Sequence, residues 1–112
     1  MKRVIGGSLI LTVILGVSLL AWAGERVEIK VAIKDHRFVP DEIRVRAGTT
    51  VKLTITNEDS TVEEFESFSL NREKLIPGGK TVTIFLPKLQ PGSYEFFGEF
   101  HPKTAQGRLI VE

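Results

Sequence analysis

Apolar and polar residues alternate with a period of two through most of this chain, and this pattern constrains the fold more than any other feature. Val27, Ile29, Val31 and Ile33 are separated by Glu28, Lys30 and Ala32. Neighbouring residues of an extended strand point to opposite faces, so such a segment buries one face and exposes the other. The alternation therefore predicts a β-strand over residues 27–34.

Six more segments with strand character follow, and short polar or glycine-rich stretches separate most of them. Turns are expected at Asn57-Glu58-Asp59-Ser60, at Pro77-Gly78-Gly79 and at Pro91-Gly92. Helical periodicity is limited to one turn expected near Asn71–Lys74. A count of about seven short strands is typical of an all-β sandwich. The six segments lie at residues 43–47, 51–56, 65–70, 82–86, 93–97 and 108–111.

The first 23 residues differ from the rest of the chain. Lys2 and Arg3 precede an uncharged apolar run from Val4 to Leu20, and Ala21-Trp22-Ala23 follows. A basic start, an apolar middle and a small-x-small end predict a secretory signal peptide over residues 1–23, cleaved after Ala23. An uncleaved membrane anchor is the alternative, because about 20 apolar residues can span a bilayer. A single exported domain is expected over residues 24–112.

Composition excludes several classes of protein. The chain has no cysteine, which excludes disulfide scaffolds, thiol enzymes, iron–sulfur proteins and thiolate-bound copper. Lys2 and Arg3 belong to the leading segment, so 13 of the 15 basic residues remain against 14 acidic ones. No basic surface is left to neutralise phosphates, and we expect no nucleic-acid partner. No arrangement for hydrolysis is visible, and no small organic substrate is expected.

An acidic stretch at residues 62–68 places three carboxylates within four residues. If Phe65 points into the core, Glu64 and Glu66 share the opposite face, and Glu63 lies on the side of Phe65. Like charges on one face repel each other unless a cation lies between them or water screens them. A solvated acidic edge that discourages strand addition is the alternative interpretation.

A second stretch, Tyr94 to Lys103, gathers aromatic residues around Gly98, Glu99 and His101. An apolar shell around a carboxylate and an imidazole is a suitable environment for a metal ion, because it orients the ligands and limits water. The alternative is an aromatic core with a surface histidine beside a turn. His36 is expected to lie in a loop and is given no role.

Glu64, Glu66, Glu99 and His101 together form a carboxylate-rich set with one imidazole. Oxygen-rich sets of this kind suit Fe(II), Fe(III), Mn(II) or a thiolate-free Cu(II) site better than soft Cu(I). The only methionine is Met1, which leaves with the signal peptide, so a Met-rich Cu(I) carrier is disfavoured.

An ordered series of short motifs resembles the cupredoxins over about Val27 to Glu112. The resemblance implies a Greek-key β-sandwich. The motifs are Phe38-Val39-Pro40, Ala47-Gly48-Thr49, Asn57-Glu58-Asp59, Pro77-Gly78-Gly79, Pro91-Gly92-Ser93-Tyr94 and the segment from Gly98 to Gly107.

The departures from the blue-copper pattern bear on function. Where that pattern has its first histidine, this chain has Glu63 or Glu64. The thiolate position falls on Gly98, the second histidine on His101 and the axial position on Gln106. Without a cysteine, an intense blue thiolate–copper centre cannot form.

The remaining features are similar to the cupredoxin-like domains of bacterial periplasmic iron-uptake systems, which accompany a high-affinity iron permease. By this resemblance, one copper or iron ion is expected on Glu64, Glu66, Glu99 and His101, with Glu63 and Glu73 as less certain ligands. The resemblance is carried by Glu64-Phe65-Glu66, by Glu73-Lys74-Leu75-Ile76-Pro77-Gly78 and by Phe97-Gly98-Glu99-Phe100-His101-Pro102.

The resemblance implies a periplasmic protein that captures ferrous iron, with or without oxidising it, and delivers it to the permease. Carboxylates favour Fe(III) over Fe(II), because hard anionic oxygens gain more from the higher charge. A periplasmic copper-binding or storage protein is the first alternative. A metal-free sandwich that acts as an interaction module is the second.

Overall fold

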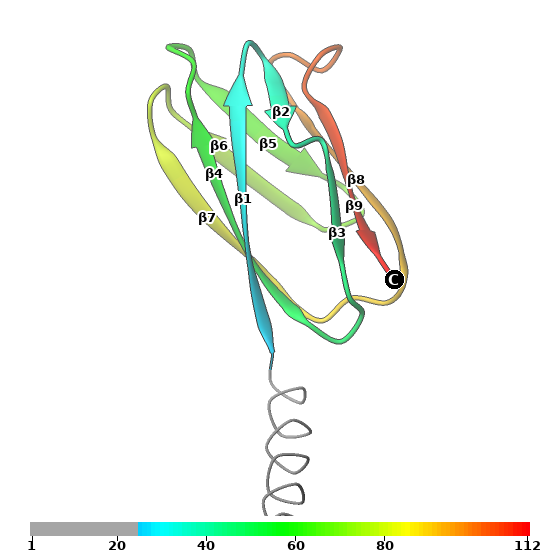
Figure 1. Ribbon diagram of the computed structural model, residues 1–112. Helices are drawn as coiled ribbons and strands as arrows, with labels where there is room; N and C mark the ends of the chain where they lie inside the picture. Colours follow the sequence, from blue (N-terminus) through cyan, green and yellow to red (C-terminus); the bar gives the residue numbers. More distant parts are fainter. Residues whose placement is uncertain (1–24) are drawn as a thin grey trace, which may run out of the picture.

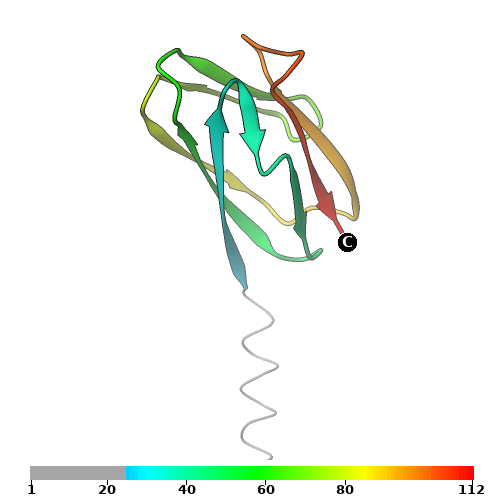
Figure 2. The same ribbon diagram turned by 45° about the horizontal axis from the view of Figure 1, so that its top comes forward.

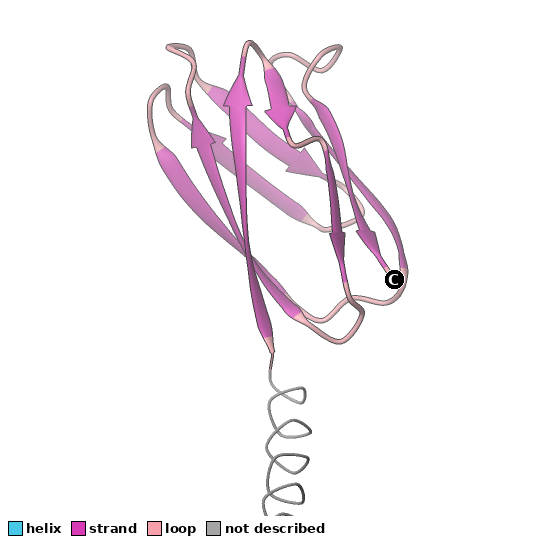
Figure 3. Cartoon of the chain, viewed as in Figure 1, coloured by secondary structure: helices cyan, strands magenta, loops and turns pink. Residues whose placement is uncertain are grey.

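The computed structural model describes residues 25–112, which form a sandwich of two β-sheets (Figures 1 and 3). The predicted signal peptide, residues 1–23, lies outside the described residues. Within 25–112 no helix is long and apolar enough to cross a membrane. The nine strands of this part of the chain are β1 Arg26–Lys34, β2 Arg37–Val39, β3 Glu42–Val45, β4 Thr50–Asn57, β5 Glu63–Ser67, β6 Arg72–Ile76, β7 Thr81–Leu86, β8 Gly92–Gly98 and β9 Gln106–Val111.

The two sheets have four and five strands. The first has the order β2-β1-β4-β7, and the second has the order β3-β9-β8-β5-β6 (Figure 2). β1 pairs with β4 in parallel, as β3 does with β9, and the other pairs are antiparallel. The chain passes repeatedly from one sheet to the other, and the all-β sandwich expected from the sequence is confirmed.

Alternating apolar residues of both sheets meet in the core, as the period of two predicts. Along β4, Val51, Leu53 and Ile55 are buried, and the residues between them are partly exposed. Phe65 and Phe96 of the second sheet stack with ring centroids 5.1 Å apart. Complete burial of a side chain of this size stabilises the fold by about 1.5–3 kcal/mol.

The structure has two strands more than the sequence predicted. The first, β2, has only three residues and is too short to show alternation. The second, β6, lies at the edge of its sheet, where Arg72, Glu73, Lys74 and Leu75 are all at least partly exposed. Edge strands commonly carry charged residues, which discourage pairing with other chains and remove the period-two signal.

The helical turn expected near Asn71–Lys74 is wrong. Asn71 adopts a left-handed conformation with φ of 53° and ends a tight turn, after which the chain enters β6. The strand expected over residues 65–70 also begins earlier and ends at Ser67. The turn reverses the chain so that β6 pairs antiparallel with β5 as a local hairpin.

Candidate metal centre

Strand β5 separates the three glutamates of the acidic stretch onto two faces. Glu63, Phe65 and Ser67 are buried between the sheets, whereas Glu64 and Glu66 lie on the outer face and are partly exposed. The prediction that Glu64 and Glu66 share the face opposite Phe65, with Glu63 on the side of Phe65, is thus confirmed.

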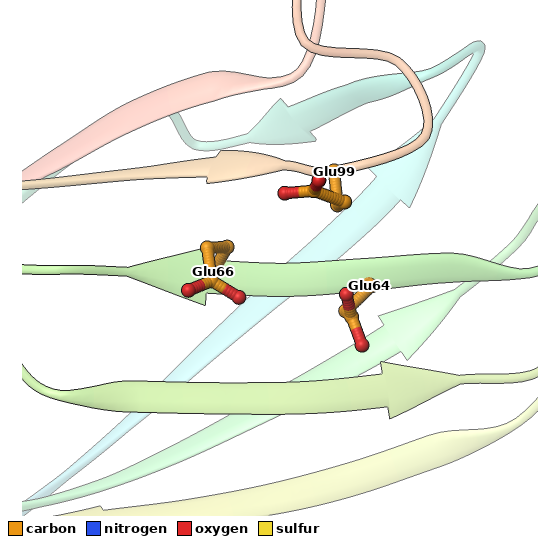
Figure 4. A group of neighbouring side chains, drawn as sticks. All are labelled: Glu64, Glu66 and Glu99. Carbon is orange, nitrogen blue, oxygen red and sulfur yellow. The ribbon is translucent and has the colours of Figure 1, made fainter.

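Glu99 reaches the same outer face from the end of β8. Pairing of Phe97 with Glu66 and of Gly98 with Phe65 aligns β8 with β5. The backbone N–H of Glu99 then donates to the carbonyl oxygen of Glu64 over 2.9 Å. The register therefore places the Glu99 side chain beside those of Glu64 and Glu66, as Figure 4 shows.

These three residues, here called the carboxylate cluster, each offer one oxygen atom within 4.8 Å of the oxygens of the other two. Two oxygens on opposite sides of an ion with bonds of about 2.1 Å lie about 4.2 Å apart. The separations of the three oxygens are therefore close to those that one cation requires.

The carboxylates of the cluster repel one another. Loss of hydration raises the pKa of Glu64 above its usual value, and the neighbouring carboxylate of Glu73 adds to the effect. The pKa of Glu66 is raised by the same two causes, together with the charge of Glu99. Glu73, a less certain ligand in the sequence analysis, lies on β6 directly opposite Glu66. Crowded carboxylates of this kind gain more from a bound cation than isolated ones do.

His101 lies apart from the carboxylate cluster. Its Nδ1 atom is 2.6 Å from Oε2 of Glu63, which faces the interior. Oε1 of Glu63 accepts hydrogen bonds of 2.9 Å from the backbone N–H groups of Glu64 and Phe100. Of the four residues predicted from the sequence as ligands of one ion, the structure brings three together and pairs the fourth with Glu63.

Gly98 leaves the space that the Glu63 carboxylate occupies. A Cβ atom at position 98 would lie 2.7 Å from the carboxyl carbon of Glu63 and 2.7 Å from Cβ of Ala105. Real Cβ atoms do not approach other atoms so closely, so glycine is required here unless its neighbours move. Gln106, at the axial position of the resemblance, is exposed, and its amide donates to the carbonyl oxygen of Pro102.

His36, to which the sequence assigned no role, stacks on His101. The ring centroids are 3.6 Å apart, and the planes differ by 12°. His36 lies in the turn between β1 and β2, at the same end of the sandwich as the connection from β8 to β9 (Figure 1). The pair Asp35-His36 lacks the glycine of the usual hairpin signals, but Asp and His adopt positive φ more often than most residues, which could have indicated a tight turn here.

Asp59 holds that turn. Asp35 and His36 have φ angles of 53° and 59°, as expected for the two central residues of a type I′ hairpin. Their backbone N–H groups donate to Oδ1 and Oδ2 of Asp59 over 2.9 and 3.0 Å. The hydrogen bond from His36 is the largest cause of the lowered pKa of Asp59.

Several solved structures share this fold. Auracyanin A, a "blue" copper protein of Chloroflexus aurantiacus, is 20% identical over 79% of this chain and 100% of its own, with a TM-score of 0.69. The metal-binding domain of the Cu(I)-exporting ATPase CopA of Streptococcus pneumoniae is 16% identical over 78% and 86% of the two chains, with a TM-score of 0.70. A purple cupredoxin of Nitrosopumilus maritimus is 21% identical over 74% and 98%, with a TM-score of 0.57. At these identities the likeness shows the fold alone.

Sequence comparison adds a nearer relative and a family. An uncharacterised protein of Rickettsia prowazekii is 50% identical over 84 residues, which are 75% of this chain and 67% of that protein. The family model for the cupredoxin-like domain matches residues 7–111. The chain therefore belongs to the family of proteins with a cupredoxin-like domain.

Proposed function

We propose that this protein is exported to the periplasm, binds ferrous iron on the carboxylate cluster and delivers it to a membrane iron permease. The observation that carries the proposal is the convergence of Glu64, Glu66 and Glu99 from two strands, with oxygen atoms within 4.8 Å of one another. An anionic, all-oxygen ligand set on an accessible face favours hard cations and allows both capture and release.

A thiolate–copper centre does not fit the residues present. The chain has no cysteine, and Gly98 faces the carboxylate of Glu63 at the position where the resemblance places the thiolate. The proposed cargo therefore binds on the outer face of β5, away from Glu63 and His101.

The ligand set also favours oxidation of the cargo. Three carboxylates stabilise Fe(III) more than Fe(II), so binding lowers the potential of the bound iron. With dioxygen as the oxidant, four Fe(II) ions give up one electron each, and one dioxygen molecule takes up four protons and leaves as two water molecules. Capture of Fe(II) without oxidation uses the same three residues.

Delivery to a permease rests on two features of the chain. The leading segment, residues 1–23, has the pattern of an export signal. The motifs around Glu64, Glu73 and Glu99 resemble the cupredoxin-like domains that accompany iron permeases. A partly exposed carboxylate cluster on one sheet face can present its cargo directly to a membrane partner.

Anaerobic calorimetric titration of the metal-free protein with Fe(II) tests the proposal. We expect one ion per chain, and binding at least about 10-fold weaker in Glu64→Gln/Glu66→Gln/Glu99→Gln. The matched control Glu25→Gln/Glu28→Gln/Asp41→Asn removes the same charge from exposed positions outside the cluster and should bind as the wild type does.

Admission of oxygen after the titration separates oxidation from capture. Loss of Fe(II) faster than in protein-free buffer, abolished in the cluster variant, supports oxidation. Cu(II) binding that the cluster variant abolishes, without Fe(II) binding, supports the copper-storage alternative. If neither metal binds more tightly than micromolar, the metal-binding function is wrong and an interaction module takes its place.

A further inference from the structure

The two histidines of this chain, 65 positions apart, are in contact with each other. His36 and His101 stack with centroids 3.6 Å apart, and their side chains are 43% and 29% exposed. Both rings are thus accessible from solvent while their positions are set by different parts of the fold. His36 is carried by the β1–β2 turn, and His101 by the β8–β9 connection.

A carboxylate faces the Nδ1 atom of each ring. Nδ1 of His101 is 2.6 Å from Oε2 of Glu63, and Nδ1 of His36 is 3.5 Å from Oδ2 of Asp59. Backbone N–H groups fix both carboxylates, those of Glu64 and Phe100 at Glu63 and those of Asp35 and His36 at Asp59. The carboxylates are therefore held in place before any ligand arrives.

This arrangement leaves the Nε2 atoms available. Within residues 25–112, neither Nε2 atom has a hydrogen-bond partner, whereas Nδ1 of His101 is within hydrogen-bond distance of Glu63 and Nδ1 of His36 is within ion-pair distance of Asp59. Histidines that bind metals commonly donate Nδ1–H to a carboxylate, which fixes the tautomer with the lone pair on Nε2. Here His101 has such a partner, and His36 lies against it with a carboxylate near its own Nδ1.

We propose that His36 and His101 form a second metal site, which takes Cu(II) through the Nε2 atoms of both rings. Glu63 acts as a positioning residue that holds the His101 imidazole through Nδ1, and Asp59 as one that holds the turn carrying His36 through its backbone N–H groups. Imidazole suits Cu(II), the divalent ion for which nitrogen and oxygen sites have the highest affinity in the first transition series. Tilting of the more exposed His36 ring opens the stack, and water completes the coordination.

The site is separate from the carboxylate cluster and does not rest on the proposed iron function. Glu63 and Glu64 are consecutive residues of β5 and point to opposite faces of the sheet. Among residues 25–112, the cluster that can converge on one ion contains Glu64, Glu66 and Glu99 but neither histidine.

Cu(II) titration of the purified protein, followed by electron paramagnetic resonance, tests the proposal. Because the chain has only two histidines, imidazole nitrogen couplings report on this site alone. We expect couplings from two imidazole nitrogens in the wild type and one in His36→Gln, with Cu(II) affinity at least about 10-fold lower in the variant. Asp59→Asn should weaken binding by a smaller factor and keep both nitrogens.

Glu64→Gln/Glu66→Gln/Glu99→Gln separates the two sites and should keep both imidazole nitrogen couplings, because these report only on the histidines and not on any Cu(II) bound by the carboxylates. His36 lies in an exposed turn, so unchanged thermal unfolding will show that its replacement leaves the fold intact. Equal Cu(II) affinity in the wild type and His36→Gln would overturn the proposal, as would loss of the nitrogen couplings in the carboxylate variant. Fe(II) binding is measured in a separate titration, so the proposed iron site and the proposed copper site can each be contradicted independently of the other.

Discussion

Oε2 of Glu63 lies 2.6 Å from Nδ1 of His101 at the inner surface of the second sheet. Glu63 is only 2% exposed, and its other carboxylate oxygen accepts two backbone hydrogen bonds. A carboxyl group buried to this degree requires hydrogen-bond partners, and both oxygens of Glu63 have them. The Glu63 side chain thereby joins β5 to the loop that carries His101.

Replacement of Glu63 by glutamine is expected to destabilise the fold by about 1–3 kcal/mol, because the amide has one oxygen where the carboxyl group uses two, one for the backbone N–H groups and one for His101. Chemical denaturation of wild type and variant at neutral pH measures the difference. Glu64→Gln is the matched control on the outer face and should not destabilise the protein. Equal losses in the two variants would show that the buried pair has no special role.

Gly98→Ala is expected to destabilise by about 1–3 kcal/mol through overpacking against Glu63 and Ala105. The φ angle of Gly98 is not in the left-handed region, so this cost is steric. Gly48→Ala provides the contrast, because its Cβ meets no atom within 4 Å and its cost comes from a φ of 83°. Thermal unfolding of both variants measures the costs, and a stability of Gly98→Ala equal to wild type would contradict the packing described at Glu63.

Removal of one charge from the carboxylate cluster is expected to stabilise the metal-free protein. The pKa of Glu64 is raised in the folded state, so its ionised form opposes folding. The gain of Glu64→Gln over wild type should be absent below the usual carboxylate pKa and should grow as pH rises through the raised value. Unfolding temperatures between acidic and neutral pH test this, and a variant less stable than wild type at neutral pH would contradict it.

Glu42 should contribute stability with the opposite pH dependence. Arg108, and then Arg44, lower the pKa of Glu42, which accepts hydrogen bonds from both guanidinium groups across β3 and β9. This contribution is present above the ordinary carboxylate pKa and is lost as pH falls through the lowered value. Glu42→Gln should therefore lose stability at neutral pH and approach wild type in acid. Salt should shrink the difference, because the pairs are exposed.

Much of this fold could be predicted from local pattern. The alternation of apolar and polar residues predicted strands such as β1 and β4. Because Phe65 points into the core, its neighbours Glu64 and Glu66 were predicted to lie together on the outer face. Local pattern fails where strands are short or lie at an edge, as for β2 and β6, because such strands bury little of one face.

The candidate sites depended on long-range register. Glu99 joins Glu64 because β8 pairs with β5, and His36 meets His101 because two connections far apart in sequence share one end of the sandwich. His101 was predicted to bind the same ion as the outer carboxylates, because His101 lies only two residues after Glu99 in the sequence. The chain turns at this point, and the His101 ring instead meets Glu63.

The most direct test of the carboxylate cluster is paramagnetic line broadening by Mn(II), a probe ion that prefers oxygen ligands. Two-dimensional amide spectra of the metal-free protein are recorded with increasing substoichiometric Mn(II). We expect the amides of Glu64, Glu66, Phe97 and Glu99 to broaden first. The variant Glu64→Gln/Glu66→Gln/Glu99→Gln should lose this broadening. Broadening that begins elsewhere, or that persists in the variant, would contradict a metal centre on the outer face of β5.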